Sequence, residues 1–172
     1  MFLTTIGICF LTSSANAKAP DWLNLSLSPD RLFDGVGELS TEAPLKKPWS
    51  IIGITAYGRD TAALNVDLGV QGRYYAIGTP QTGGFVATEL RYANIIYRND
   101  GDDFDVFFIK PGILLGGKYQ FDIGLTIDSA TGVEYVQTIV SELEKRQPIS
   151  TADWSLQYRI NIGWTLQREK DK

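Results

Sequence analysis

The sequence contains no histidine, and its single cysteine, Cys9, lies close to the N-terminus. Without histidine the chain cannot supply a Ser–His–Asp triad, a Cys–His pair or a histidine-ligated zinc site. It also has no nucleophile motif of the G-x-S-x-G type and no glycine loop of the kind that cradles phosphate. We therefore expect no catalytic residue, no cofactor and no metal site.

An excess of positive charge is missing as well. The chain has 16 Lys and Arg against 20 Asp and Glu, for a formal net charge of -4. Proteins that bind nucleic acid neutralise phosphates with a basic surface, so we expect no nucleic-acid partner. Beyond the N-terminal segment, every apolar run is much shorter than the roughly 20 residues that a membrane-spanning helix needs.

The N-terminal segment has the features of a secretory signal. An apolar run from Phe2 to Leu11 precedes Ala15-Asn16-Ala17, which fits an A-x-A cleavage site. We predict a signal peptide at 1–17 and one β-barrel domain at 18–172. Because no Lys or Arg precedes the apolar run, the alternative is a short buried strand or helix of the mature domain.

Two-residue alternation is the dominant pattern of the remaining chain. In "WSLQYRINIGWTL", Leu156, Tyr158 and Ile160 share one face of an extended strand, whereas Arg159 and Asn161 share the other. The pattern predicts eight strands near 22–29, 34–44, 49–59, 62–77, 84–98, 104–119, 121–137 and 153–167. An even number of strands places both termini at the same end of the sheet.

The connections between these strands differ in length and character. Short ones are expected at 45–48, at 78–83 and around Gln120, and polar ones at 30–33, 59–61, 99–103 and 138–152. Helical spacing competes with alternation at 139–146, so we expect that a turn of helix can form in the last connection.

The polar face carries as many acidic as basic residues. Its charged members are Asp67, Arg73, Glu89, Arg91, Lys110, Lys118, Asp122, Asp128, Glu134 and Arg159. Buried charges need partners, so this balance suits a narrow barrel interior in which Glu89 pairs with Arg73 or Arg159. Paired carboxylates such as Asp122 with Asp128 or Glu89 also occur in acid–base catalysis, but we interpret them as structural.

The apolar face carries aromatic side chains near the strand ends. Trp154 and Trp164 are ten residues apart in the sequence. At about 3.3 Å per residue and a tilt of roughly 40°, they are about 25 Å apart along a barrel axis, close to the apolar height of an outer-membrane barrel. We predict an aromatic girdle of Trp154, Trp164, Tyr92, Tyr119 and Phe85. The alternative is the apolar core of a soluble β protein.

The residues "GVQGRYYAIG" (69–78), "GGFVATELRYA" (83–93), "PGILLGGKYQFDIGLTIDSATGVEY" (111–135) and "QYRINIGWTL" (157–166) carry a family likeness. The chain resembles the small eight-stranded outer-membrane β-barrel proteins of the OmpA/OmpX type. Within that class it is similar to an uncharacterised family of short Gly- and Tyr-rich barrels. The resemblance implies an all-β, antiparallel up-and-down transmembrane barrel in the bacterial outer membrane. Its implied partners are the lipid bilayer and the outer-membrane assembly machinery.

These observations favour an outer-membrane barrel with a structural or surface-interaction role and no enzyme activity. Two alternatives remain open at this point. A soluble, lipocalin-like periplasmic barrel would line a ligand cavity with its apolar face. A narrow conduit or lipid-handling barrel would use the lumen charges directly.

The acidic segment "RNDGDDFD" allows one further interpretation. Asp100, Asp102, Asp103 and Asp105 offer closely spaced oxygen ligands of the kind that calcium prefers. The segment lacks the downstream Glu of an EF-hand loop, so we interpret it as a solvated turn. The sequence identifies no surface partner.

Overall fold

The computed structural model describes residues 21–167, apart from 34, 60–62, 100–101 and 143–148. The predicted signal peptide at 1–17 and Asp100 of the acidic segment lie outside the described residues. Residues 143–146 of the expected helical turn at 139–146 also lie outside them. Residues 139–142 are described and form strand instead of helix.

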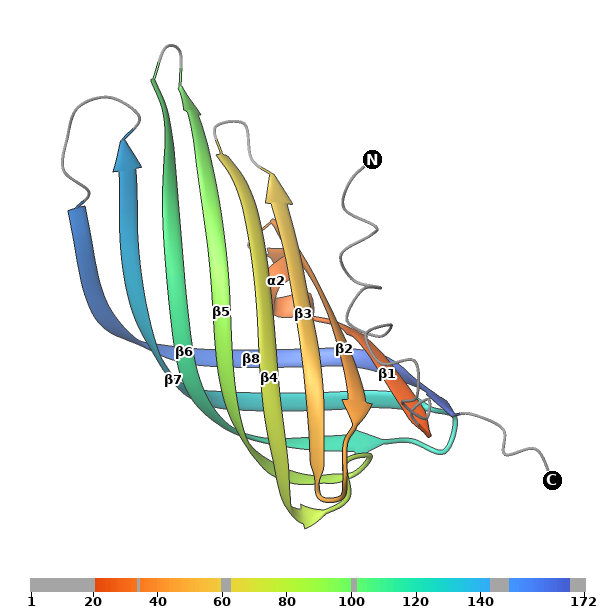
Figure 1. Cartoon of the computed structure of the whole chain (residues 1–172). Helices are drawn as coiled ribbons and strands as arrows, with labels where there is room; N and C mark the ends of the chain where they lie inside the picture. The colour runs from red at the N-terminus through yellow and green to blue at the C-terminus, as the bar shows by residue number, and fades with distance from the viewer. Residues whose placement is uncertain (1–20, 34, 60–62, 100–101, 143–148, 168–172) are drawn as a thin grey trace, which may run out of the picture.

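Eight strands and one short helix form the fold. They are β1 (Trp22–Leu27), α2 (Pro29–Phe33), β2 (Val36–Pro44), β3 (Trp49–Arg59), β4 (Ala63–Gly78), β5 (Gly83–Asn99), β6 (Asp102–Gln120), β7 (Leu125–Glu142) and β8 (Ile149–Gln167). Each strand pairs antiparallel with the next, and β8 pairs with β1, which closes the barrel (Figure 1). The predicted eight-stranded meander is confirmed.

Strand β7 begins at Leu125, later than the predicted start at 121, because residues 121–124 form a turn. Phe121 N donates to Leu125 O, and Gly124 N donates to Phe121 O. Gly124 has a φ of 88°, a conformation that residues with a Cβ rarely adopt. Asp122 is therefore in an exposed turn and not in a strand.

Helix α2 occupies the connection that was expected to be merely polar. Pro29 is its first residue, and Gly35, with a φ of 73°, follows its end. Proline at the start and glycine just past the end are common signals of helix termini. The helix contacts β2 and β8. The described residues include no helix that is long and apolar enough to span a membrane.

The strands are unequal in length, which makes the barrel wall uneven. β1 has 6 residues and β2 has 9, whereas β4 to β8 have 16 to 19. β1 covers only Ile162–Gln167 of β8. Figure 1 shows β5, β6 and β7 rising well beyond β1 and β2. We call the end where β1 begins and β8 ends the near end, and the end that carries α2 the far end.

Strict alternation sets which side chains face inward. In β3, Ile52, Ile54 and Ala56 are buried, whereas Ile51 and Tyr57 are exposed. A small apolar cluster also lies inside the barrel, made of Tyr75, Phe85, Ala87, Leu114 and Ala130. Most other inward positions are polar or charged, so the charged interior is the distinctive feature of the fold.

Candidate functional site

The barrel interior holds charged side chains that are almost fully buried. The buried acids are Glu38, Glu42, Asp67, Glu89 and Asp128, and the buried bases are Arg73, Arg91, Lys118 and Arg159. They come from β2, β4, β5, β6, β7 and β8, and form two linked clusters. Burial of a charge is costly unless the charge is paired, so the contacts decide what this interior can do.

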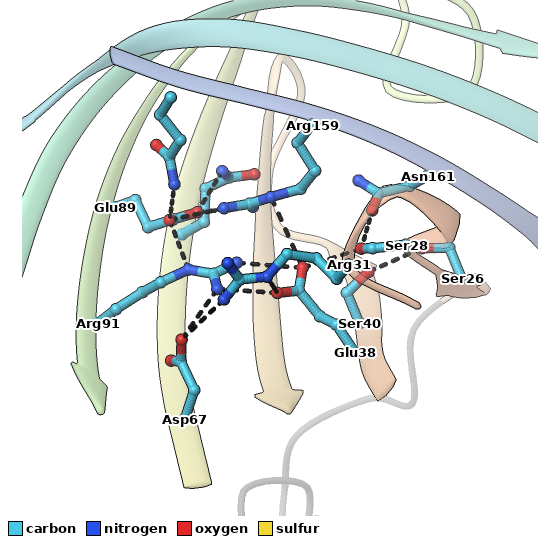
Figure 2. Close-up of polar contacts among 12 residues, drawn as sticks. Ser26, Ser28, Arg31, Glu38, Ser40, Asp67, Glu89, Arg91, Arg159 and Asn161 are labelled. Carbon is cyan, nitrogen blue, oxygen red and sulfur yellow. Dashed lines mark hydrogen bonds and ion pairs between the residues drawn. The ribbon is translucent and has the colours of Figure 1, made fainter. Parts of the chain in front are cut away.

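Arg91 is the centre of the far cluster. Its Nε lies 2.7 Å from Glu89 Oε1, and its Nη1 lies 2.8 Å from Glu38 Oε2 and 3.2 Å from Asp67 Oδ2. Figure 2 shows the guanidinium between the three carboxylates, which come from β5, β2 and β4. One side chain thus holds three strands together across the lumen.

Glu89 receives further hydrogen bonds in the same cluster. Both terminal nitrogens of Arg159 donate to it at 2.9 Å, in the fork geometry that gives strong and directional pairing. Gln71 Nε2 also donates to it at 2.8 Å. The expected pairing of Glu89 with Arg159 is therefore present, whereas Arg73 pairs elsewhere.

The near cluster is built around Glu42 and Arg73. Lys118 Nζ lies 2.6 Å from Glu42 Oε2, and Tyr75 Oη donates to Glu42 at 2.7 Å. Arg73 Nη2 lies 3.2 Å from Asp128 Oδ1. Arg73 Nε also donates to Gln71 Oε1 at 2.7 Å, so Gln71 joins this cluster to Glu89.

Two of the buried acids and one base were missed at the sequence level. Glu38 and Glu42 alternate with Leu39 and Thr41 in β2, so their inward direction was readable from the sequence. Arg31 of α2 was not readable, because a helix of five residues shows no periodicity. Its Nη2 lies 3.4 Å from Asp67 Oδ2, so the helix closes the far cluster.

Three of the expected lumen charges are not fully enclosed. Lys110 is partly exposed, and its Nζ lies 3.7 Å from Asp67 Oδ2. Glu134 is partly buried and has no ion-pair partner among the described residues. Asp122 departs from the expectation altogether, because it lies in the exposed turn before β7. The acid–base pairs proposed for Asp122 are therefore not formed.

Phe85 also departs from the expectation, because it lies inside the barrel and is 3% exposed. Its ring lies 4.1 Å from the guanidinium carbon of Arg73, a cation–π contact. The alternation of β5 requires this direction, since Phe85 has the same parity as Glu89. Gly116 makes room for the ring: a Cβ there would lie 2.5 Å from Phe85 Cζ.

The other predicted girdle residues face outward. Trp154 is 69% exposed and Tyr119 is 56% exposed, and Trp164 and Tyr92 are also exposed. Several outward rings pack in pairs: Trp49 with Tyr74, Tyr119 with Phe121, Tyr92 with Phe107, and Tyr135 with Trp154. A lipocalin-like carrier would have its apolar face inside, which is the opposite of this arrangement.

Within the described portion of the chain, no three acidic, cysteine or histidine side chains are close enough to hold a metal ion. Asp105 is partly buried near the start of β6, and the side chains of its acidic neighbours are not among those described.

Comparisons with known proteins bear on the fold. No protein-family model and no curated protein sequence matches the chain. The N-terminal β-barrel domain of OprF from Pseudomonas aeruginosa does match in structure, with a TM-score of 0.57, 15% sequence identity and coverage of 86% of this chain and 98% of that domain.

The fold is OmpA-like. The likeness spans 98% of the OprF domain, and the eight strands of this chain run in up-and-down order. The predicted resemblance to small outer-membrane barrels is confirmed at the level of the fold.

Proposed function

We propose that this chain is an outer-membrane β-barrel that spans the bilayer and has a structural or surface-interaction role without catalytic activity. One observation carries the proposal: the barrel is apolar outside and charged inside. A soluble barrel has the opposite arrangement, because water contacts its outer surface.

The outer surface suits lipid in composition as well as in polarity. Leu39, Ile113 and Leu115 are exposed there, with aromatic rings toward both ends. Between the rings, the outward-facing residues in the described strands include no charge. An Arg or Lys on the lipid face costs about 2–4 kcal/mol near the bilayer midplane, which gives a physical reason for this pattern.

The OmpA-like fold supports a proposal for the orientation of the barrel in the membrane and for how it is inserted there. On this proposal the near end, with its short turns, the start of β1 and the end of β8, faces the periplasm, and the far end with α2 faces the exterior. The bilayer of the bacterial outer membrane is then the main partner, and the outer-membrane assembly machinery inserts the chain. Loops at the far end are placed to contact surface partners.

The two ion-pair clusters favour a plug over a pore. They fill the lumen from Glu42 at the near end to Arg91 and Arg31 at the far end, and their carboxylates are engaged by arginine or lysine. The same pairing leaves no poised acid–base group among the buried carboxylates. We therefore expect no single-channel steps in planar bilayers, and regular steps would favour the narrow-conduit alternative.

Cell fractionation tests the membrane assignment. Bacteria that produce the full chain are separated into soluble, inner-membrane and outer-membrane fractions, and the protein is run on gels boiled and unboiled. We expect it in the outer membrane, released by detergent and not by high salt, with a heat-dependent gel mobility. Recovery in the soluble fraction without detergent would refute the proposal.

A further inference from the structure

A cavity of about 140 Å³ lies at the far end of the lumen, between α2 and β8. Arg31, Arg91 and Arg159 of the far cluster form part of its wall. Its polar lining includes Arg31, Lys110, Glu134 and Gln157. A cavity of this size is large enough for several waters or one small polar group.

The cavity lies where the barrel wall is incomplete. β1 pairs only with Ile162–Gln167 of β8, and among the described residues no strand covers the same edge of β8 from Ile149 to Asn161. Leu156 and Tyr158 face outward on that stretch, are 86% and 62% exposed, and also line the cavity. The cavity therefore extends from the lumen charges to the apolar outer surface.

The lining contains hydrogen-bond donors that the far cluster does not use. Arg31 Nε is buried, and the nearest carboxylate oxygen, Glu38 Oε2, is 3.6 Å away, too far for a hydrogen bond. Among the described residues, Lys110 Nζ lies 3.7 Å from Asp67 Oδ2 and 5.9 Å from the centre of the Phe108 ring, and neither contact is a hydrogen bond. Arg91, by contrast, donates to three carboxylates.

The lining also contains acceptors without donors. Gln157 Oε1 is buried, and no described residue donates to it, although its Nε2 donates to Glu89 at 3.1 Å. Glu134 has no ion-pair partner in the described part of the barrel. Buried polar groups without partners are rare in native proteins and call for an explanation. Here positively charged donors, a neutral amide oxygen and a carboxylate share one cavity.

We propose that this cavity binds a phosphate ester that also carries an ammonium group, a phosphoethanolamine-type head group. Lys110 and Arg31 donate to the phosphate, and Glu134 and Gln157 Oε1 accept from the ammonium. The chain of an amphiphile leaves the barrel past Leu156. The position of the chain rests on the proposed membrane function, whereas the head-group chemistry does not.

Calorimetric titration of the purified full chain in a maltoside detergent tests the site. The probes are lysophosphatidylethanolamine, lysophosphatidylglycerol, free O-phosphoethanolamine and inorganic phosphate. We expect lysophosphatidylethanolamine to bind most tightly and free O-phosphoethanolamine to bind more weakly at the same site. If the free head group binds as tightly as the lipid, the ligand is a soluble phosphate ester and the amphiphile part is wrong.

Variants assign the two halves of the head group. Lys110→Met should weaken lysophosphatidylethanolamine by about tenfold or more, because a hydrogen bond to a charged group is worth at least about 1.5 kcal/mol. Lys110→Arg should restore most of that loss. Glu134→Gln should weaken lysophosphatidylethanolamine and leave lysophosphatidylglycerol unchanged. Lys47→Met, on the exposed turn at the near end, is the matched control and should bind as the natural chain does.

The outcomes separate this inference from the proposed function. Absence of binding for all probes, or equal losses for Lys110→Met and Lys47→Met, would overturn the site even if the chain fractionates with the outer membrane. Equal effects of Glu134→Gln on both lysolipids would refute the ammonium half. Binding of O-phosphoethanolamine by a chain that proves soluble would keep the head-group site and refute the membrane assignment.

Discussion

Replacing Arg91 by Met should strongly destabilise the folded barrel. The methionine nearly fills the space of the lost side chain but leaves three buried carboxylates with fewer partners. Glu89 keeps its two hydrogen bonds from Arg159. Glu38 keeps the Ser28 hydroxyl at 2.9 Å and arginine nitrogens no closer than 3.6 Å. Asp67 keeps Arg31 at 3.4 Å and Lys110 at 3.7 Å.

The size of the effect follows from these remaining contacts. All three carboxylates lose their closest charged donor, and of the three only Glu89 keeps arginine nitrogens as close as 2.9 Å. Breaking a buried ion pair by removing one partner costs about 3–5 kcal/mol. At 1.4 kcal/mol per factor of ten, the folding equilibrium constant should fall by about a hundred- to several-thousand-fold. Adding Glu38→Gln to Arg91→Met should restore part of the lost free energy of unfolding, because it removes one buried carboxylate charge that has no close partner.

Urea unfolding in lipid vesicles, followed by tryptophan emission and gel mobility, measures the change. Arg59→Met is the matched control, because Arg59 is exposed at the end of β3 and has no ion pair in the described structure. It should change the free energy of unfolding by less than about 1 kcal/mol. If Arg91→Met costs no more than Arg59→Met, the far cluster does not hold the barrel together.

Three further outcomes follow from the same structure. Ile113→Arg places a charge on the outer face midway along β6 and should cost about 2–4 kcal/mol in vesicle unfolding, whereas Ile113→Val should be nearly neutral. Phe85→Ala removes a buried ring and should cost about 3–5 kcal/mol by the same assay; a loss below 1 kcal/mol would place the ring outside. Gly116→Ala should also destabilise, since its Cβ would lie 2.5 Å from Ser129 O and from the Phe85 ring.

The sequence predicts the barrel well because one physical pattern dominates the chain. Alternation fixes the face of each residue in a long strand, and β4 and β8 were therefore assigned correctly along most of their length. The closed order of strands follows from an up-and-down chain with short connections. What alternation does not decide, on its own, is which face contacts water.

The errors in the candidate site have separate causes. Phe85 was assigned by residue type, although its parity with Glu89 already placed it inside. Parity places Asp122 on the lumen face only if the strand begins at 121, whereas the turn at Gly124 delays the start of β7 to Leu125. Glu38 and Glu42 were readable from β2, since they alternate with outward-facing residues.

Other parts of the site could not be read from the sequence. Arg31 reaches the far cluster from α2, a helix too short for a periodic signal. Asp67 lies 24 residues from Arg91 in the sequence, and Glu38 lies 53 residues from it. Only the closed barrel brings these residues together. One edge of β8 is left without a neighbouring strand because β1 pairs only with Ile162–Gln167. The length of that pairing depends on how the strands align and cannot be read from amino-acid composition.

The most direct test of the central claim uses two native tryptophans on neighbouring strands. Trp22 of β1 faces the lumen beneath Lys118, and Trp164 of β8 faces outward near the same end. Single-tryptophan variants, with the other tryptophans changed to Phe, are inserted into vesicles of lipids brominated near the top of the acyl chains. We expect strong quenching of Trp164 and little quenching of Trp22. Equal quenching of both, or stronger quenching of Trp22, would contradict the claim that the apolar face contacts lipid and the charged face lines the interior.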